Sequence, residues 1–371
     1  MSRVDVTAVP EVGRTIGVEE EFHLLDPATG TLTTGAGRIM HAQTGTVAVP
    51  ELQRSMIETS TPICANMSDV DRHVRASRRS LLDAADRAGV WAAAAGTVPG
   101  SGRPVGAVFP DPRYEHMAAE YRQLVAEQQV CACQIQVGVP DREAAVPLMR
   151  RVRLWLPALL ALSTASPYFL DGDTGYASYR TIVLSRWPTA GPPPLFTSAA
   201  EYDRTVSRLI ASGVISDVGM IYFDVRASAR YPTLEIRVAD ACPLVGDVVL
   251  LAALARALVV TAAAEELAGV APPPIEHILL RAATWRAARS GLGGQLVDPL
   301  EAQEVPAPEL IERLLRHLRP ALEDRGDWPL VTASTAELMG RGTSAHRQRK
   351  AFRQAGPAAV VAHVLAETRR L

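Results

Sequence analysis

Lysine is almost missing from this sequence of 371 residues. Of its 38 lysines and arginines, only Lys350 is a lysine, and it lies outside any glycine-rich loop. A Walker-type phosphate loop and a strand lysine of the protein-kinase type are therefore excluded, because both place a lysine on the phosphates. A phosphate site in this chain must use backbone amides, a metal ion or arginine, whose planar fork suits phosphate and carboxylate oxygens.

Cysteine is scarce as well. The 4 cysteines are Cys64, Cys131, Cys133 and Cys242, and they lack the paired spacing of a zinc site. Cys131 and Cys133 fall on the apolar side of a predicted strand at 131–139. We therefore interpret them as core thiols in a reducing cytoplasm.

The chain has no large excess of charge of either sign. Its formal net charge is -2, so neither nucleic acid nor an anionic membrane surface is expected as a partner. No amino-terminal run combines a basic head with an apolar stretch, so we expect a cytoplasmic protein rather than a secreted one. The most apolar segment, 248–264, contains Arg256 and follows Asp247, and it predicts a buried helix rather than a membrane span.

Acidic residues are concentrated in one predicted strand near the amino end. Residues 15–25 read Thr-Ile-Gly-Val-Glu-Glu-Glu-Phe-His-Leu-Leu. Strand alternation places Glu19, Glu21 and His23 on one face and leaves Glu20 out of phase. Two carboxylates on one face repel each other, which raises their pKa values unless a cation lies between them. A bound divalent metal ion explains the segment, and so does a solvated edge strand with a negative face.

Acids recur in two further predicted strands. Glu51 and Glu58 lie in the segment 50–62, whose Thr/Ser run and final proline suit a strand that ends in a turn. In the segment 232–240, Glu235 and Arg237 share a face opposite the aliphatic residues. The strand before it ends at Arg226, and the short connection predicts a hairpin. Each segment alone could be an ordinary amphipathic strand, whereas their recurrence favours a common site.

A series of short motifs extends over nearly the whole chain beyond a short amino-terminal tail. They are Gly-Val-Glu-Glu-Glu-Phe at 17–22 with Asp26, the segment 51–62, Gly-Thr at 96–97 with Pro99, Val-Gly-Val-Pro-Asp-Arg at 137–142, Ser-Tyr-Arg at 178–180, Arg-Trp-Pro-Thr-Ala-Gly-Pro at 186–192, Asp-Val-Arg at 224–226, Thr-Leu-Glu-Ile-Arg-Val at 233–238 with Asp240, and Arg-Gln-Arg at 347–349. In kind and order this series resembles the type 2 glutamate–cysteine ligases, also called carboxylate–amine ligases.

The strands and the resemblance lead to one expected architecture. The alternating strands predict an α+β protein with a predominantly antiparallel sheet and helices packed behind it. The resemblance implies that this sheet is curved around the active site, as in the glutamine synthetase-like fold. We expect residues 1–13 to form a flexible tail and residues 14–371 to form a single catalytic domain. The expected helices are 68–88, 115–130, 148–165 with a split at Pro157, 248–268, 276–290, 309–318 and 357–371.

The resemblance also implies an activity. It implies an ATP-dependent ligase that forms an amide through an acyl phosphate, joining the γ-carboxyl of glutamate to cysteine or another amine. ATP would be a co-substrate, Mg2+ or Mn2+ the metal, small molecules the partners, and a homodimer one compatible assembly. Two alternatives stay open: the same chemistry on a different carboxylate and amine in specialised biosynthesis, or a catalytically silent nucleotide- or metabolite-binding protein.

Residue roles follow from the positions that match the family. Metal ligation is implied for Glu19, Glu21, Glu58, Gln134 and Glu235. Catalytic roles are implied for Glu58, Arg180 and Arg237, with Arg237 on the transferred phosphoryl group. Binding of substrate or ATP is implied for Glu51, Gln136, Arg186, Arg226 and Arg347. For each arginine, the alternative is an ordinary ion pair.

The chain departs from the family pattern at two places. Gln134-Ile-Gln136 stands where the family commonly has His-X-His, and Val98 stands where it often has histidine after Gly-Thr. Alternation keeps Gln134 and Gln136 on the polar face of their strand, so their amide oxygens could ligate a metal or bind substrate. The alternative is that Gln134 only forms hydrogen bonds with a neighbouring strand or substrate. These departures leave the amine acceptor open.

Overall fold

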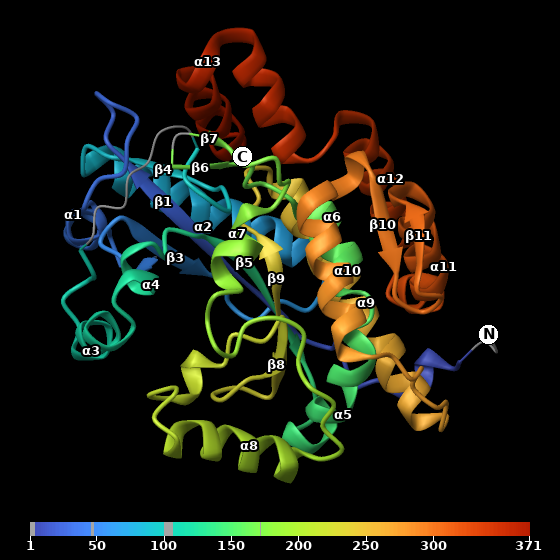
Figure 1. Ribbon diagram of the computed structural model, residues 1–371. Helices are drawn as coiled ribbons and strands as arrows, with labels where there is room; N and C mark the ends of the chain where they lie inside the picture. Colours follow the sequence, from blue (N-terminus) through green and yellow to red (C-terminus); the bar gives the residue numbers. More distant parts are fainter. Residues whose placement is uncertain (1–3, 46–47, 100–106, 171) are drawn as a thin grey trace.

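A seven-stranded sheet forms the centre of the molecule. The computed structural model describes residues 4–45, 48–99, 107–170 and 172–371. The strand order is β2-β3-β1-β5-β9-β8 with β4 beside β1, and the strand pairs of this sheet are antiparallel (Figure 1). The strands are β1 (Ile16–Leu25), β2 (Ala48–Pro50), β3 (Met56–Ser60), β4 (Trp91–Ala93), β5 (Ala132–Gly138), β8 (Val225–Ala227) and β9 (Thr233–Asp240). The predicted α+β class with an antiparallel sheet is confirmed.

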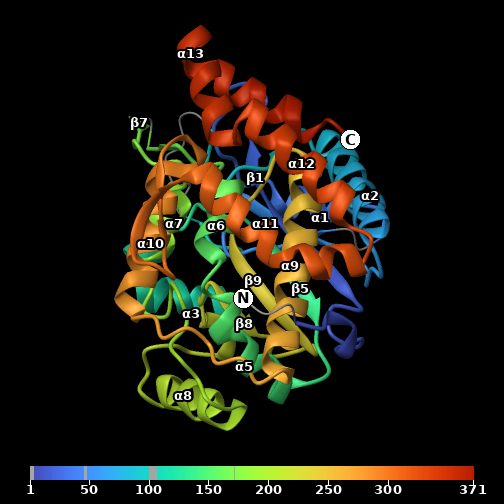
Figure 2. The ribbon, with the colours of Figure 1, turned by 90° about the vertical axis from the view of Figure 1, so that its right-hand side faces the viewer.

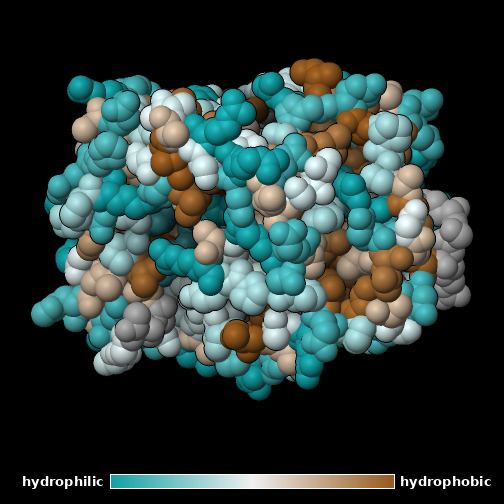
Figure 3. Space-filling model, turned by 90° about the horizontal axis from the view of Figure 1, so that it is seen from below, coloured by the Kyte–Doolittle hydropathy of each residue, from teal (hydrophilic) through white to brown (hydrophobic). Residues whose placement is uncertain are grey.

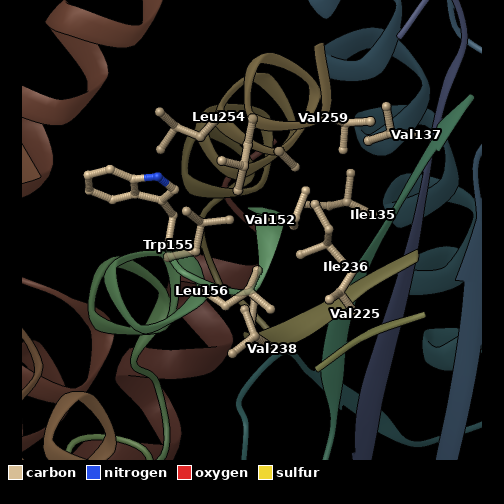
Figure 4. Close-up of a cluster of buried hydrophobic side chains, with 14 of the residues drawn as sticks. Ile135, Val137, Val152, Trp155, Leu156, Val225, Ile236, Val238, Leu254 and Val259 are labelled. Atoms are coloured by element: carbon tan, nitrogen blue, oxygen red, sulfur yellow. The ribbon is translucent and has the colours of Figure 1, made fainter. Parts of the chain in front are cut away.

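One face of the sheet is apolar and packs against helices. Alternation turns Ile135 of β5 and Ile236 and Val238 of β9 to this face, where each is at most 3% exposed. Figure 4 shows these side chains beside those of α5 (Arg142–Val152) and α9 (Val245–Leu267). Burying each such side chain contributes about 1.5–3 kcal/mol. This packing fixes the register of the strands and so turns their alternate, polar residues to the opposite face.

Helix α9 is the longest apolar element of the molecule. Among the described residues it is the one helix that is long and apolar enough to cross a membrane. It lies buried between the sheet and the carboxy-terminal helices, so it serves as a core helix, as its sequence predicts.

Two helices differ from the prediction at their ends. Helix α2 (Met67–Arg87) begins at the N-cap Asn66, whose side chain accepts a hydrogen bond from Asp69 N, and not at Ser68. The helix expected over 115–130 is divided into α3 (Pro112–Tyr121) and α4 (Gln123–Ala126). Arg122 separates them because its positive φ of 50° cannot continue a helix.

The predicted split near Pro157 is confirmed, although the break precedes the proline. Helix α5 ends at Val152, and α6 (Leu156–Ser163) begins after a short turn. Pro157 lies in the first turn of α6, where its missing N–H has no intrahelical partner to lose.

The carboxy-terminal part is mostly helical and lies beside the sheet domain (Figure 2). It consists of α10 (His277–Ser290), β10 (Gln295–Asp298), β11 (Gln303–Pro306), α11 (Ala307–Asp324), α12 (Trp328–Arg341) and α13 (Ser344–Thr368). The β10–β11 hairpin and α12 were not predicted. Helix α13 is kinked at Ala355 and Gly356, just before Pro357, where a separate helix was expected to begin.

Short elements complete the fold. They are η1 (Val6–Ala8), α1 (Ala36–Ala42), β6 (Tyr168–Phe169), β7 (Gly172–Asp173), α7 (Tyr179–Leu184), α8 (Ala199–Ala211), η2 (Val218–Met220) and η3 (Gly291–Gly293). Val6 and Val12, within the segment predicted as a tail, are buried in the main core.

Candidate active site

The register of the sheet brings the predicted polar residues together. Antiparallel pairing sets Glu21 opposite Glu58, Glu19 opposite Gln134, Gln136 opposite Glu235, and Arg226 opposite Glu235. Side chains at directly opposed positions lie about 4.5–5.5 Å apart at Cβ. Residues from β1, β3, β5, β8 and β9, far apart in the sequence, therefore share one polar face.

Two adjoining cavities lie along this face. We call them the inner chamber, of about 70 Å³, and the outer cavity, of about 680 Å³. The charged residues of the inner chamber are Glu21, Glu51, Arg113, Arg180, Asp224 and Arg237. Those of the outer cavity are Glu19, Glu58, Asp111, Arg113, Asp217, Arg226, Arg230 and Glu235. Arg113 and Tyr114 line both, and so connect the two cavities.

The outer cavity lies toward the end of the molecule that carries β8. Its lining includes Arg226 of β8, residues 228–231, which leave the sheet after β8, and residues at the start of α3. Figure 3 views the molecule from this lower end, where the surface is mostly hydrophilic and is hollowed left of its centre. A polar, open cavity of this kind suits a charged ligand.

Glu58 and Glu19 lie in a region short of positive charge. Burial raises the pKa of Glu58 well above its ordinary value, and nearby Glu51 and Glu19 add to the effect. Burial and the charge of Glu235 raise the pKa of Glu19 in the same direction. Groups in this condition are ionised more easily when a cation binds beside them.

Glu21 and Glu51 belong to the inner chamber. Glu21 accepts hydrogen bonds from Ala132 N and from Gln134 Nε2, both at 2.8 Å. The Tyr114 hydroxyl donates to Glu51 at 3.3 Å. Burial, with the charge of Glu21 as a second cause, raises the pKa of Glu51 to about 7.

Glu235 differs from the other acids of the polar face because two arginines lie beside its carboxylate. Arg226 Nε donates to its Oε2 at 2.5 Å, and Arg237 Nη1 lies 3.3 Å from the same atom. Burial acts against ionisation, but the charges of Arg226 and Arg237 outweigh it and lower the pKa of Glu235. Arg226 is held in place by the carbonyl oxygens of Gly219 and Ile221.

The two glutamines at the family's histidine positions both form bridges. Gln134 donates to Glu21, and its amide oxygen accepts from Arg237. Gln136 donates to Glu19 at 3.2 Å, and its oxygen accepts from the Thr233 hydroxyl at 2.7 Å. Each amide oxygen already has one donor, so a metal ion on Gln134 would use the second lone pair and would lie beside the positive charge of Arg237.

Arg180 extends from α7 to the inner chamber. Its Nη1 and Nη2 donate to the carbonyls of Val238 and Arg237 at 3.2 and 3.1 Å. The Ser178 hydroxyl, at the N-cap of α7, donates to buried Asp240 at 2.8 Å. The Ser-Tyr-Arg motif is thus anchored to the end of β9 and places Arg180 in the chamber wall.

Two predicted substrate contacts lie outside both cavities. Arg186 forms a salt bridge with Glu127. Arg347 donates from Nε and Nη2 to Glu367 at 2.6 and 3.0 Å. Neither arginine belongs to the lining of the inner chamber or the outer cavity.

His23 shares the strand phase of Glu21 but does not orient a carboxylate. It is fully buried, and among the described residues no carboxylate accepts a hydrogen bond from either ring nitrogen. Burial lowers the pKa of His23 to about 3, so the ring is neutral. His23 is therefore a buried core residue, although strand alternation places it on the same face as Glu21.

The structure adds three residues that the sequence prediction did not assign to the site. Arg113 and Tyr114 come from the first turn of α3 and cover the polar face. Nothing in their local sequence marks them, because they reach the site through tertiary packing. Asp224 also lines the inner chamber. Its place in the motif Asp-Val-Arg, two residues before Arg226, was a usable signal.

The donor atoms suit a hard divalent cation, although the side chains do not converge. Among the described residues, no three Asp, Glu, His or Cys side chains come together as a metal-binding group. Glu19, Glu58 and Glu235 nevertheless line one cavity with carboxylate oxygens, the ligands that Mg2+ prefers. Burial, and after it the neighbouring carboxylates, raise the pKa values of Glu19 and Glu58, so a cation bound beside them would stabilise their ionised forms. We carry these three forward as proposed cation ligands.

Known proteins share this fold. The chain matches the structure of the glutamate–cysteine ligase of Francisella tularensis in complex with AMP with a TM-score of 0.69. The match covers 97% of this chain and 88% of that one at 12% identity, and it shows the fold alone. The predicted antiparallel architecture of a ligase of this kind is confirmed.

Curated relatives are much closer in sequence. A protein of Frankia casuarinae is 48% identical over 356 residues, which cover 95% of this chain and 41% of that protein. A protein of Salinispora tropica is 43% identical over 361 residues, which cover 96% of this chain and 95% of that protein. Both carry the name glutamate–cysteine ligase 2 as an inferred assignment. The chain thus spans less than half the length of the first of these relatives.

The family model agrees with the relatives and with the order of the motifs. The model of glutamate–cysteine ligase family 2 matches residues 15–363, from the start of the acidic strand to the second half of α13. The chain belongs to glutamate–cysteine ligase family 2.

Proposed function

We propose that the protein is an ATP-dependent ligase that joins a carboxylate to an amine through an acyl phosphate. We assign the γ-carboxyl of glutamate as donor and cysteine or another small amine as acceptor. The observation that carries this proposal is the polar face itself, where Glu19, Glu58 and Glu235 lie beside Arg237 across two adjoining cavities. This combination serves phosphoryl transfer, which depends on positioning and charge neutralisation.

The chemistry requires activation because a carboxylate oxygen is a poor leaving group. Transfer of the γ-phosphoryl group of ATP to the donor carboxylate gives a mixed anhydride, from which phosphate can leave. The outer cavity is the larger of the two and takes the nucleotide. Glu19, Glu58 and Glu235 would hold Mg2+ or Mn2+ there, and such an ion would neutralise charge on the phosphate oxygens.

The arginines act at the boundary between the cavities. Arg237 lies next to Glu235 and Gln134, where its guanidinium holds the phosphoryl group in transfer. Arg226 orients Glu235 through its ion pair, and its Nη1 donates to the backbone carbonyls of Gly219 and Ile221. Arg180 stabilises negative charge at the inner chamber.

The test is product formation by the purified protein. ATP, Mg2+ and a matrix of carboxylates and amines are supplied, ADP is measured, and the product is identified by mass spectrometry. The proposal expects ADP release that requires both a carboxylate and an amine, and a product with the mass of their amide. Release of AMP would contradict phosphoryl activation. Nucleotide binding without turnover on any pair would favour the catalytically silent alternative.

A further inference from the structure

Asp224 has a carboxylate oxygen with no partner. Its side chain lines the inner chamber, and the residue is 8% exposed. Its Oδ2 is buried and accepts no hydrogen bond from any described residue. Burying such an atom without a hydrogen bond lowers the stability of the fold by about 1–3 kcal/mol. A ligand that donates a hydrogen bond to Asp224 Oδ2 would remove this penalty.

The backbone, and not the carboxylate, holds Asp224 in place. Asp224 N donates to Gly191 O at 2.8 Å, and Arg237 N donates to Asp224 O at 2.9 Å. The residue is therefore fixed between the segment before α8 and strand β9. Its carboxylate stays free to interact with whatever enters the chamber.

Arg180 provides the complementary charge in the same chamber. Its Nε is buried and, among the described residues, has no hydrogen-bond partner. The Nη1 and Nη2 atoms of Arg180 donate to backbone carbonyls, and Nη1 lies 3.9 Å from Asp240 Oδ1, so Nε is the atom left without a partner. Arg113 is paired with Asp217 at 2.7 Å and Arg237 with Glu235 at 3.3 Å. Of the chamber acids, Glu21 accepts two hydrogen bonds and Glu51 accepts one from Tyr114. Among the described residues that line the chamber, the fully buried side-chain atoms without a partner are Asp224 Oδ2 and Arg180 Nε.

The walls limit the size of the ligand. Apolar side chains, including Leu52, Met117 and Leu184, also line the inner chamber. Its volume of about 70 Å³ admits only a small ligand and excludes a nucleotide, for which the outer cavity is available. A small zwitterion with an apolar body matches both the free charges and the walls.

We propose that the inner chamber binds the amine acceptor as a small amino-acid zwitterion, and that Asp224 anchors its ammonium group and removes a proton from it. Arg180 binds the acceptor's carboxylate. This inference rests on the proposed ligase function and adds to it the acceptor's class and its base. Burial raises the pKa of Asp224 to about 7, partly offset by the charge of Arg180, which suits proton uptake near neutral pH.

The step balances as follows. The ammonium gives one proton to the Asp224 carboxylate, and the freed amine nitrogen forms a bond to the acyl carbon of the mixed anhydride. The carbon–oxygen bond to phosphate breaks, and phosphate leaves with the bonding electrons. A second nitrogen proton passes to the leaving phosphate. The products are the amide, hydrogen phosphate and protonated Asp224, which then loses its proton to solvent.

Asp224→Asn tests the base directly, with hydroxylamine as the reference acceptor. Hydroxylamine is largely uncharged at neutral pH, so its attack on the acyl phosphate needs no proton acceptor. With glutamate, ATP and Mg2+, the variant should lose far less of its hydroxamate formation than of its ligation of amino acids. Its ligation of L-cysteine, or of another α-amino acid that the wild type uses, should fall at least ~100-fold with a raised acceptor KM. The exposed Asp83→Asn, on α2, is the matched control and should change neither reaction.

Each other outcome is decisive. Equal loss of both reactions in a folded Asp224→Asn protein would make Asp224 structural and overturn the inference. Hydroxamate formation by a wild type that accepts only amines without a carboxylate would overturn the zwitterion assignment. Absence of both hydroxamate and amide in the wild type would reject the proposed function itself, which is a different result.

A binding measurement on the wild type covers the case in which the variant does not fold. An acceptor analogue with hydrogen in place of the amino group, 3-mercaptopropionate for cysteine, should compete at least ~10-fold more weakly than the amine, because it cannot donate to Asp224. Equal competition by the two compounds would remove the ammonium anchor from the chamber.

Discussion

Glu20 and Glu21 are neighbours in β1, but they lie on opposite faces of the sheet and their carboxylates have different electrostatic surroundings. On the helix-covered face, Glu20 forms a buried salt bridge with Arg78 of α2 at 2.6 Å. Arg78 also donates to the carbonyls of Cys242 and Pro243. On the polar face, Glu21 shares its surroundings with Glu58, and burial raises the pKa of both.

This difference distinguishes a carboxylate that stabilises the fold from carboxylates whose charge a bound ligand would compensate. Glu20 has a dedicated cation whose own hydrogen bonds are satisfied, so this pair needs nothing from outside the chain. The polar face holds more negative charge than its arginines compensate, and within the described chain no arginine forms a salt bridge with Glu58. A bound cation or a phosphate–metal complex would supply what is missing.

Breaking the structural pair should have the largest effect on stability. Arg78→Met leaves Glu20 as an unpaired buried charge, and the free energy of unfolding should fall by about 3–5 kcal/mol. Urea unfolding measures the loss. Arg75→Met, on the same helix, removes an exposed pair with Asp71 and should cost no more than about 0.5 kcal/mol. Similar losses in the two variants would show that the Arg78 pair adds nothing beyond a surface ion pair.

Removing a polar-face carboxylate should instead affect activity. Glu58→Gln should lower metal-dependent turnover at least ~10-fold, the lower range for a disturbed metal site. Its free energy of unfolding at neutral pH should stay equal or rise, because an ionised Glu58 is repelled by Glu51 and Glu19. Amide formation and urea unfolding are measured on the same preparation. Glu20→Gln is the matched comparison and should lose stability; a Glu58→Gln protein with full turnover would remove Glu58 from the site.

The strands of the site could be predicted because each carries its own local signal. In β1 and β9, apolar residues alternate with acids or arginines, and burial of the apolar set fixes which face the polar set occupies. The pairing of Glu20 with Arg78 could not be predicted. The two residues lie 58 positions apart, and their contact depends on how α2 packs across the sheet.

The family motifs mix structural and chemical residues, which the sequence alone does not separate. Gly96 is a structural case, since a Cβ atom there would lie 2.6 Å from Asp240 Cγ. Asp240 accepts hydrogen bonds from Ser166 and Ser178 and so fixes the segment that carries Arg180. Asp224 is the opposite case, because its oxygen is left unbonded in a cavity. Only the surroundings of each carboxylate reveal which kind it is.

Arg347, which is paired with Glu367 within α13, tests whether a motif residue of the helical part stabilises the fold or binds a ligand. Arg347→Gln breaks the two hydrogen bonds to Glu367 and should lower the free energy of unfolding by about 1.5 kcal/mol. The KM for ATP should not change, because Arg347 lines neither cavity. Thermal unfolding and steady-state kinetics give the two values. A raised KM for ATP without loss of stability would support the predicted contact between Arg347 and ATP.

The smallest expected effect is a change in the pH dependence of stability, and it probes the excess negative charge of the polar face directly. Burial and Glu21 raise the pKa of Glu51 to about 7, so between about pH 4.5 and 7 the folded protein binds a proton that the unfolded chain has released. Stability from this group is therefore present at the acidic end and is lost as the pH rises toward 7. Glu51→Gln removes the titration, so its unfolding free energies at about pH 5 and 7 should differ less than those of the wild type. Glu312→Gln, an exposed change on α11, should leave the wild-type difference intact.

Added Mg2+ should raise the wild-type melting temperature more at the higher pH, because carboxylates must be ionised to bind it. Identical pH profiles for wild type and Glu51→Gln would mean that the polar face carries no uncompensated charge at Glu51.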